Sequence, residues 1–339
     1  MNRPALLTLI YMASTLCGAA PGETDLAAPP AKSASEIQGI DLRFDSSKPT
    51  FGEAESPTFS VHAATGKQMS DLRLWTFEDA HAIIYRKAEE NLQLAAKSMA
   101  VDMDKKSAQL AGGVRVTSGR LIIDVADMAW DDIARIAKTD SVATLDDGAN
   151  RITGESLSIH PDDDLIELGR GSGSIRLAAV AEKPAPAKDE KPSTQDKFDK
   201  IDIKKQQHTA ANLSGRLREV KGPAEIELVG KDPNDSITVA ADLVTFGYAT
   251  DEDTSPSALI FKGRVVFTLS QGTVRTDQAS VDFSAGKVQF RGKVSVELTQ
   301  LRAGPMDSLD LDLNTGDIDI SPGQIVSSLS FKPAPAKKP

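Results

Sequence analysis

One short unit recurs about every 30 residues in this chain of 339 residues and limits what the chain can fold into. Each copy is a run of apolar and acidic residues such as Ala126–Asp131 or Thr276–Asp282. Aligned on their first apolar residue, the copies lie at Met99, Met128, Leu157, Leu243, Ala279 and Leu309, in steps of 29, 29, 86, 36 and 30 residues. Recurrence at this length is typical of repeat architectures, in which each unit is one small piece of supersecondary structure.

Within the units, apolar and polar residues alternate and glycines punctuate the runs. Apolar residues at 294, 296 and 298 alternate with polar residues at 293, 295 and 297, and the same period of two occurs at 309–313 and 317–320. A period of two places the apolar residues on one face of a β-sheet, and the glycines mark turns between strands. A polar second face is typical of antiparallel sheets. We therefore predict an all-β, antiparallel fold.

The stretch 77–95 is ambiguous. A helical stripe would contain the apolar residues Phe77, Ala80, Ile84, Ala88, Leu92 and Ala95. Strands fit equally well, because apolar residues also alternate at 75–77 and at 80–84. Because the stretch runs without a break into the unit at Met99, we favour strands.

The N-terminus has the features of a secretory signal peptide. Arg3 precedes an apolar run at 5–16, and small residues follow at 18–20. The run is too short for a transmembrane helix, which needs about 20 apolar residues. We predict a signal peptide at 1–20 and export to the periplasm. Two alternatives remain: acylation of Cys17, as in lipoproteins, although Leu16 is larger than the residue that this processing prefers, and a buried apolar segment.

Three segments rich in Pro, Ala, Lys and Glu have almost nothing to bury, and this composition favours extended, solvated chain. We predict a disordered leader at 21–35, a linker at 180–199 and a disordered tail at 330–339. They leave two folded blocks, at 36–179 and 200–329.

Composition excludes several functions. The net charge of −10 and the absence of long basic runs argue against nucleic-acid binding. One cysteine cannot form a zinc–thiolate site or an intrachain disulfide. We expect no metal, no cofactor and no enzymatic activity, and we identify no catalytic residue.

Two local motifs invite a functional interpretation. The acidic run at 160–164 could bind Ca²⁺ through oxygen ligands, but it lacks the spacing of a calcium loop, so we predict a solvated hairpin turn. Gly171-Ser172-Gly173 superficially suggests a hydrolase nucleophile elbow, but it lies between two short apolar alternations, so we predict a strand bend.

The repeated pattern, a Gly-Val-x-Val strand followed by a turn and an (Ala/Thr)-Asp-x-apolar strand, resembles the OstA-like family, which includes periplasmic proteins of lipopolysaccharide transport. The stretches 110–131 and 261–282, with their continuations to 159 and 296, carry the resemblance. It covers about two thirds of the exported chain.

The resemblance implies an open antiparallel β-jellyroll, a bent slot whose apolar inner face holds lipid acyl chains. Lipopolysaccharide or a related lipid is the implied ligand, and other β-jellyroll transport components are the implied partners through strand edges. The implied slot-lining residues are Val114, Val116, Leu121, Ile123, Met128, Trp130, Leu157, Ile159, Val265, Phe267, Ala279, Val281, Phe283, Val294 and Val296.

Three features depart from the family pattern. We expect two blocks where one is usual, and the apolar run at 5–16 is too short for the transmembrane anchor of inner-membrane-attached members. The acidic charge would repel phosphates unless basic residues cluster locally or divalent cations bridge them. Two hypotheses follow: a periplasmic lipid-binding or bridge protein, or a ligand-free structural β-solenoid or scaffold of the cell envelope with a filled core. The uneven steps of the repeat favour the lipid-binding hypothesis. Whether the two blocks share one slot is left open.

Overall fold

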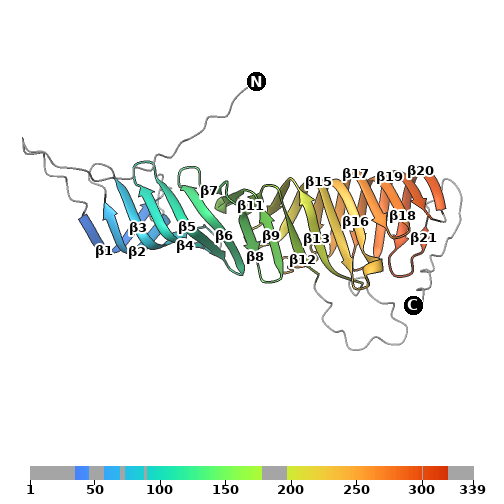
Figure 1. The fold of residues 1–339 in the computed structure, drawn as a ribbon, viewed down its shortest axis with the longest axis horizontal. Coiled ribbons are helices and arrows are strands. Elements are labelled where there is room, and N and C mark those ends of the chain that lie inside the picture. Colours follow the sequence, from blue (N-terminus) through green and yellow to red (C-terminus); the bar gives the residue numbers. More distant parts are fainter. Residues whose placement is uncertain are drawn as a thin grey trace, which may run out of the picture. The chain divides into compact units, whose positions relative to one another are not determined.

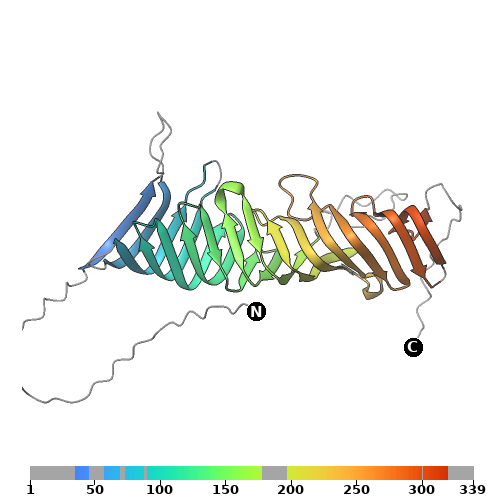
Figure 2. The same ribbon diagram turned by 90° about the horizontal axis from the view of Figure 1, so that it is seen from above.

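The computed structural model describes residues 35–45, 57–68, 73–87, 90–177, 197–299 and 301–319, and all of them belong to one compact unit at 34–339. In this part of the chain, 21 strands form one sheet with antiparallel pairing throughout, and the only helical elements are two 3₁₀ turns. Figures 1 and 2 show the strands following one another in chain order. The all-β prediction is confirmed, and so are strands within 77–95.

The elements in chain order are β1 (Ser35–Asp45), β2 (Pro57–Gln68), β3 (Leu74–Ile84), β4 (Leu92–Asp102), β5 (Ser107–Ser118), β6 (Leu121–Asp131), β7 (Ile136–Thr139), β8 (Ala143–Asp146), β9 (Asn150–Gly154), β10 (Leu157–His160), η1 (Pro161–Asp163), β11 (Leu165–Leu168), β12 (Gly171–Arg176), β13 (Phe198–Gln206), β14 (His208–Ala211), β15 (Leu217–Gly230), η3 (Pro233–Asp235), β16 (Ile237–Gly247), β17 (Ala258–Leu269), β18 (Gly272–Asp282), β19 (Lys287–Leu298), β20 (Leu301–Asp312) and β21 (Ile318–Asp319).

Each long strand from β4 to β6 and from β15 to β19 changes direction near its middle. In β4, buried side chains alternate up to Ala96 and resume at Met99, with two outward residues between them. In β5 they alternate up to Leu110 and resume at Val114, with three between. The pairing of the two strands shifts register at this point. An extra residue on one strand of a pair bends that strand, so each shift produces a corner.

Because of the corner, both halves of a strand turn their apolar side chains inward. Phe261 and Phe267 lie on opposite sides of the corner of β17, yet their rings meet edge to face with centroids 5.4 Å apart. The sheet therefore folds along a line of corners and encloses an interior between its two halves. We call this interior the slot.

Glycine is needed at the three-residue corners. Gly263 has φ +73°, and a Cβ there would lie 2.7 Å from the Asp242 carboxylate of the neighbouring strand. Gly292 also has φ +73°, and a Cβ there would lie 3.1 Å from the Asp277 carboxylate. Left-handed backbone and close approach together favour glycine over any other residue.

In the middle of the sheet the corner becomes a break. β7 and β8 pair with opposite halves of β6, and β13 and β14 pair with opposite halves of β15. The short strands β7 to β14 thus form four broken strands that continue the same meander.

The predicted linker joins β12 to β13. Residues 178–196 lie outside the described residues, but Ile175 of β12 pairs with Ile201 of β13, and β13 begins at Phe198, inside the predicted linker. The described parts of the two predicted blocks therefore share one sheet and one slot, which answers the question that the sequence left open. The predicted signal peptide with Cys17, most of the leader and the tail lie outside the described residues.

The structure also explains the repeat and corrects one position in it. Met99, Met128, Leu157 and Ala279 are each the first buried residue after a corner or break, and so is Leu309. Leu243 is a half-buried corner residue, and the equivalent position is Val244. The alignment was one residue off because two apolar residues stand side by side there.

Candidate functional site

The fifteen residues that the resemblance to the OstA-like family implies as slot-lining lie in the interior of the folded sheet. All fifteen are buried at 2% exposure or less and belong to one continuous apolar core. Several of the largest, among them Trp130, Phe267 and Phe283, are fully enclosed. The inward orientation is therefore as expected. The same burial means that these side chains pack against one another.

The slot opens along the side opposite the corners, between two rows of turns. One row, which we call row A, includes the turns 85–91, 119–120 and 147–149; the other, row B, includes the turns 132–135 and 212–216. Among the described strands, pairing joins only neighbours in the meander, so no strand pair closes this mouth. Side chains bridge it instead.

Arg135 makes the most extensive bridge. From row B its guanidinium donates to the backbone carbonyls of Thr58 at 3.0 Å and Tyr85 at 2.7 Å, both on the row A side. It also pairs with Asp162 and lies 3.6 Å from Asp132. Charge-assisted hydrogen bonds of this kind are among the stronger ones in proteins. This group ties the mouth at the β2–β3 end.

Asp132 is buried within the same bridge. Its Oδ2 accepts a hydrogen bond from the Thr58 hydroxyl at 2.9 Å, and only 4% of the side chain is exposed. Burial raises the pKa of Asp132 above the ordinary carboxyl value, although the Thr58 hydrogen bond and the charge of Arg135 oppose the shift.

The acidic run at 160–164 forms a second bridge. It makes the turn η1, as expected for a hairpin, but Asp164 is not merely solvated: it pairs with Arg86 of row A at 3.2 Å and Arg218 at 3.3 Å. Arg86 also donates to the carbonyl of Pro161. Arginines pair with Asp162 and Asp164 of the run, and the described residues contain no group of acids, histidines or cysteines able to hold a metal ion.

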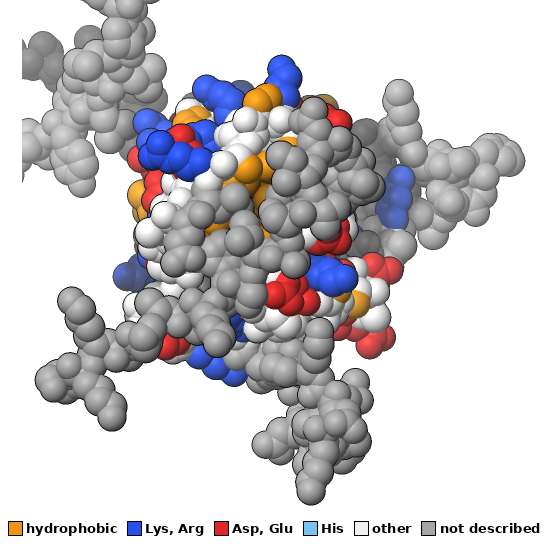
Figure 3. All heavy atoms as spheres, turned by 90° about the vertical axis from the view of Figure 1, so that its right-hand side faces the viewer, with side chains coloured by type: hydrophobic (Ala, Val, Ile, Leu, Met, Phe, Trp, Pro, Cys, Tyr) orange, Lys and Arg blue, Asp and Glu red, His pale blue; other side chains and the backbone are white. Residues whose placement is uncertain are grey.

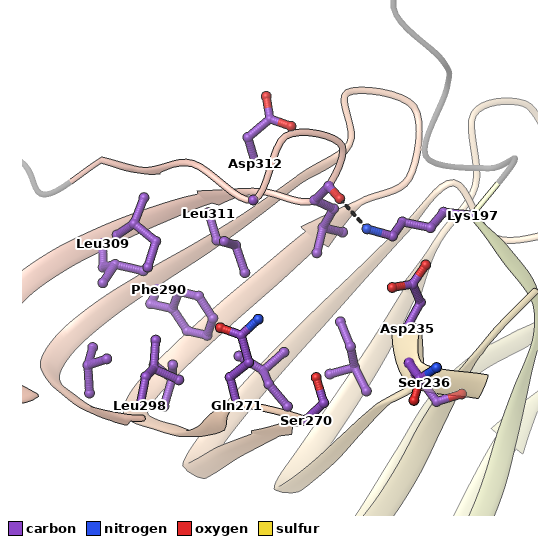
Figure 4. Close-up of a pocket in the computed structure, with 18 residues that line it drawn as sticks. Lys197, Asp235, Ser236, Ser270, Gln271, Phe290, Leu298, Leu309, Leu311 and Asp312 are labelled. Carbon is purple, nitrogen blue, oxygen red and sulfur yellow. Dashed lines mark hydrogen bonds between the residues drawn. The ribbon is translucent and has the colours of Figure 1, made fainter. Parts of the chain in front are cut away.

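Further bridges are sparser. The Asn150 amide donates to the carbonyl of Thr254, and the Ser255 hydroxyl donates to the carbonyl of Arg176. Towards β20 the ammonium group of Lys197 donates to the carbonyl of Leu313 at 2.6 Å (Figure 4). The mouth is therefore tied most firmly near β2–β6 and least firmly near β20.

A recess of about 920 Å³ lies in the mouth beside the ion pair of Arg86 with Asp164, and both of these residues line it. Row A contributes Arg86, Glu90 and Arg120, and row B contributes residues from 212–218 and 245–251. The walls hold four arginines and three carboxylates, an excess of one positive charge in a chain of net charge −10.

One wall of this recess is held rigidly. The guanidinium of Arg216 stacks on the ring of Tyr248, 4.3 Å from its centroid, and donates to the backbone carbonyl of Asp251. Burial raises the pKa of Tyr248 to about 12, so its hydroxyl stays neutral and cancels none of the arginine charge.

A smaller apolar pocket of about 140 Å³ opens at the β20 end of the slot. Leu298, Leu309, Leu311 and Phe290 line it, with Lys197 and Asp235 at its rim (Figure 4). Figure 3 looks onto this end and shows hydrophobic side chains among the described residues. The pocket extends the apolar lining of the slot to this end.

The slot also contains a polar spot at the break between β13 and β14. Gln206 is 2% exposed and Thr209 is fully buried, and neither side chain has a hydrogen-bond partner among the described residues. Buried polar groups without partners cost free energy, so this spot interrupts an otherwise apolar lining.

Sequence reasoning missed the bridges across the mouth, because residues such as Arg135 and Asp164 are polar turn residues like many others. Gly171-Ser172-Gly173, where the sequence predicts a strand bend, opens β12, and the pairing of β12 with β13 shifts register between Gly171 and Gly173. A Cβ at Gly171 would lie 1.8 Å from the carbonyl oxygen of Thr153, so glycine lets β12 pair closely with β9.

No protein-family model matches this chain, and no curated protein matches it. The described residues contain no helix with the length and apolar character to span a membrane.

Proposed function

We propose that this chain is a non-enzymatic, periplasmic lipid-binding or bridge protein that holds acyl chains in its slot and takes part in lipopolysaccharide transport to the outer membrane, as the likeness to the OstA-like family implies. One observation carries the proposal. The slot has a continuous core that is apolar apart from the polar spot at Gln206 and Thr209, and side chains rather than strand pairs bridge its mouth, with an apolar pocket at its β20 end.

The energetics are compatible with a slot that opens. Burying each methylene contributes about 0.8 kcal/mol, so a chain of about 12–14 carbons supplies several kcal/mol. The pocket of about 140 Å³ has the size of cavities that accept a benzene-sized group, so it admits the end of an acyl chain only. The remainder of the acyl chain can enter the slot only if hydrogen bonds across the mouth break. Each broken hydrogen bond has a net cost of about 0.5–3 kcal/mol, which is less than the free energy gained by burying the chain.

Strand edges are the proposed contacts with partners. β1 pairs on one side with β2, and β20 pairs with β19 and, at Asp310 and Leu311 alone, with β21. An unpaired edge is a template for another strand, and addition of a partner strand is a common form of recognition. Other β-jellyroll transport components are the partners we propose.

A second candidate function is a ligand-free scaffold of the cell envelope. The close packing of the slot favours it: Val281, Val294 and Phe283 have no exposed surface without any ligand. A filled core needs no lipid to be stable.

Native mass spectrometry of the chain purified from a Gram-negative periplasm distinguishes the two. The lipid-binding function predicts a co-purifying lipid that Leu311→Asn, in the pocket, weakens several-fold. Gln289→Asn, on the exposed face of β19, serves as the matched control. Circular dichroism establishes that both variants fold. A lipid-free mass after incubation with lipopolysaccharide contradicts the lipid-binding function and favours the scaffold.

A further inference from the structure

The arginine-lined recess in the mouth has a chemistry that the apolar slot lacks. Its arginines come from both rows of turns: Arg86 and Arg120 from row A, Arg216 and Arg218 from row B. Arginine presents a planar fork of donors that matches phosphate oxygens and keeps its charge at any physiological pH.

Two of the arginines are available to a ligand. Arg120 is exposed and makes no ion pair with any described residue. Half of the Arg218 side chain is exposed, and its partner Asp164 also pairs with Arg86, which is nearly buried. Arg216 is fixed by Tyr248 and Asp251 and lends its charge without moving. One face of the recess is thus preorganised and the other can adjust.

The floor of the recess is apolar. Leu213, Leu217 and Phe246 line it and are 1%, 3% and 6% exposed, and all three belong to the core of the slot. A charged rim directly above an apolar interior fits a molecule with an anionic head and a hydrocarbon tail. Free phosphate would use the rim alone.

From this arrangement we infer that the recess binds the phosphate headgroup of an amphiphile whose acyl chain occupies the slot below. The inference rests on the proposed lipid-binding function. It adds a headgroup site midway along the slot and gives an acidic chain the local basic cluster that a phosphorylated lipid requires.

The test compares three probes on the purified full-length chain by calorimetry: tetradecyl phosphate, the uncharged tetradecyl maltoside, and inorganic phosphate. We expect tetradecyl phosphate to bind at least tenfold more tightly than the maltoside, and the double variant Arg120→Gln, Arg218→Gln to remove about tenfold of that affinity. Arg170→Gln, which breaks an exposed ion pair with Glu155 away from the recess, is the matched control and should leave binding unchanged. Circular dichroism and thermal unfolding establish that the variants fold.

The outcomes distinguish failure of the headgroup site from failure of the proposed lipid-binding function. Equal affinity for the two amphiphiles, or no effect of the double variant, overturns the headgroup site and leaves lipid binding intact. Inorganic phosphate binding as tightly as tetradecyl phosphate reduces the recess to a simple anion site and overturns the inference. If neither amphiphile binds, the proposed lipid-binding function fails together with the headgroup site.

Discussion

The middle of the sheet and its β20 end solve the same folding problem in different ways. From β16 to β19 each strand stays continuous and bends at a corner, where positive-φ glycines such as Gly263 and Gly292 serve the three-residue corners. From β7 to β14 each strand breaks instead, and the two pieces pair with opposite halves of the meander. The mouth also differs between the two regions. Arginine bridges join the turns near β2–β6 to the turns beside the broken strands. At the β20 end, the mouth has one lysine bridge and an apolar pocket.

Folding of the sheet and closure of the mouth therefore depend on different interactions. Corners and breaks both turn apolar residues inward, and burial of these residues drives the fold in either region. Closure of the mouth depends on polar side chains from distant parts of the sequence. The two tasks can therefore be disturbed separately.

The largest expected effect comes from crowding the backbone in the broken region. Gly171→Ala places a methyl group 1.8 Å from the Thr153 carbonyl, and we expect it to lower the free energy of unfolding by about 3 kcal/mol. Gly113→Ala, in the continuous strand β5, meets nothing within 4 Å and suffers only from φ +93°, so we expect a loss of about 1 kcal/mol. Denaturant midpoints measure both. Equal losses would contradict the close approach of β9 and β12.

A smaller loss of stability is expected when a bridge across the mouth is removed, and it should differ between the two ends of the mouth. Arg135→Met removes two hydrogen bonds to carbonyls and the pairing with Asp162, and we expect a loss of about 2 kcal/mol. Lys197→Met removes one hydrogen bond, and we expect a loss of about 0.5–1 kcal/mol. Urea unfolding of both variants measures the difference. A larger loss for Lys197→Met would mean that the β20 end, not the β2–β6 end, holds the mouth closed.

The smallest expected effect is on the pH dependence of stability, which should have opposite signs at Asp132 and Asp242. The pKa of Asp132 is raised, mainly by burial, so its contribution to stability is present below the ordinary carboxyl pKa of about 3.9 and is lost as pH rises through the raised value. The pKa of Asp242, at the corner in β16, is lowered by Arg264, so its contribution is present above about 3.9 and is lost as pH falls through the lowered value.

Asn substitutions at these two positions should therefore respond oppositely to pH. Relative to the parent chain, Asp132→Asn should be more favourable to stability at pH 7 than at pH 3, and Asp242→Asn less favourable at pH 7 than at pH 3. Urea unfolding at the two pH values measures both. A shared sign would contradict the burial of Asp132 in the bridge.

The period of two in the sequence predicts which face of β19 is buried. It places Val294, Val296 and Leu298 on one face, and all three are buried, because a strand with one apolar face has one way to remove that face from water. Val116 and Ile123, which the resemblance to the OstA-like family implies to face inward, are buried as well.

Gly119 lies in a turn between strands, as the glycine pattern predicts. The pattern was wrong at Gly263 and Gly292, which lie inside β17 and β19 at corners rather than between strands, because a corner also needs the backbone geometry that glycine tolerates.

Two features depend on folding of the whole sheet: the described parts of the two blocks share one slot, and Arg86, Arg135 and Asp164 bridge its mouth. Pairing of Ile175 with Ile201 crosses a Pro-rich segment whose composition predicts a linker, because composition reports what a segment can bury and not where its ends meet. The bridges join residues 50–78 positions apart in sequence. A polar turn residue carries no sign of its distant partner, so folding of the whole sheet was needed to bring these charges together.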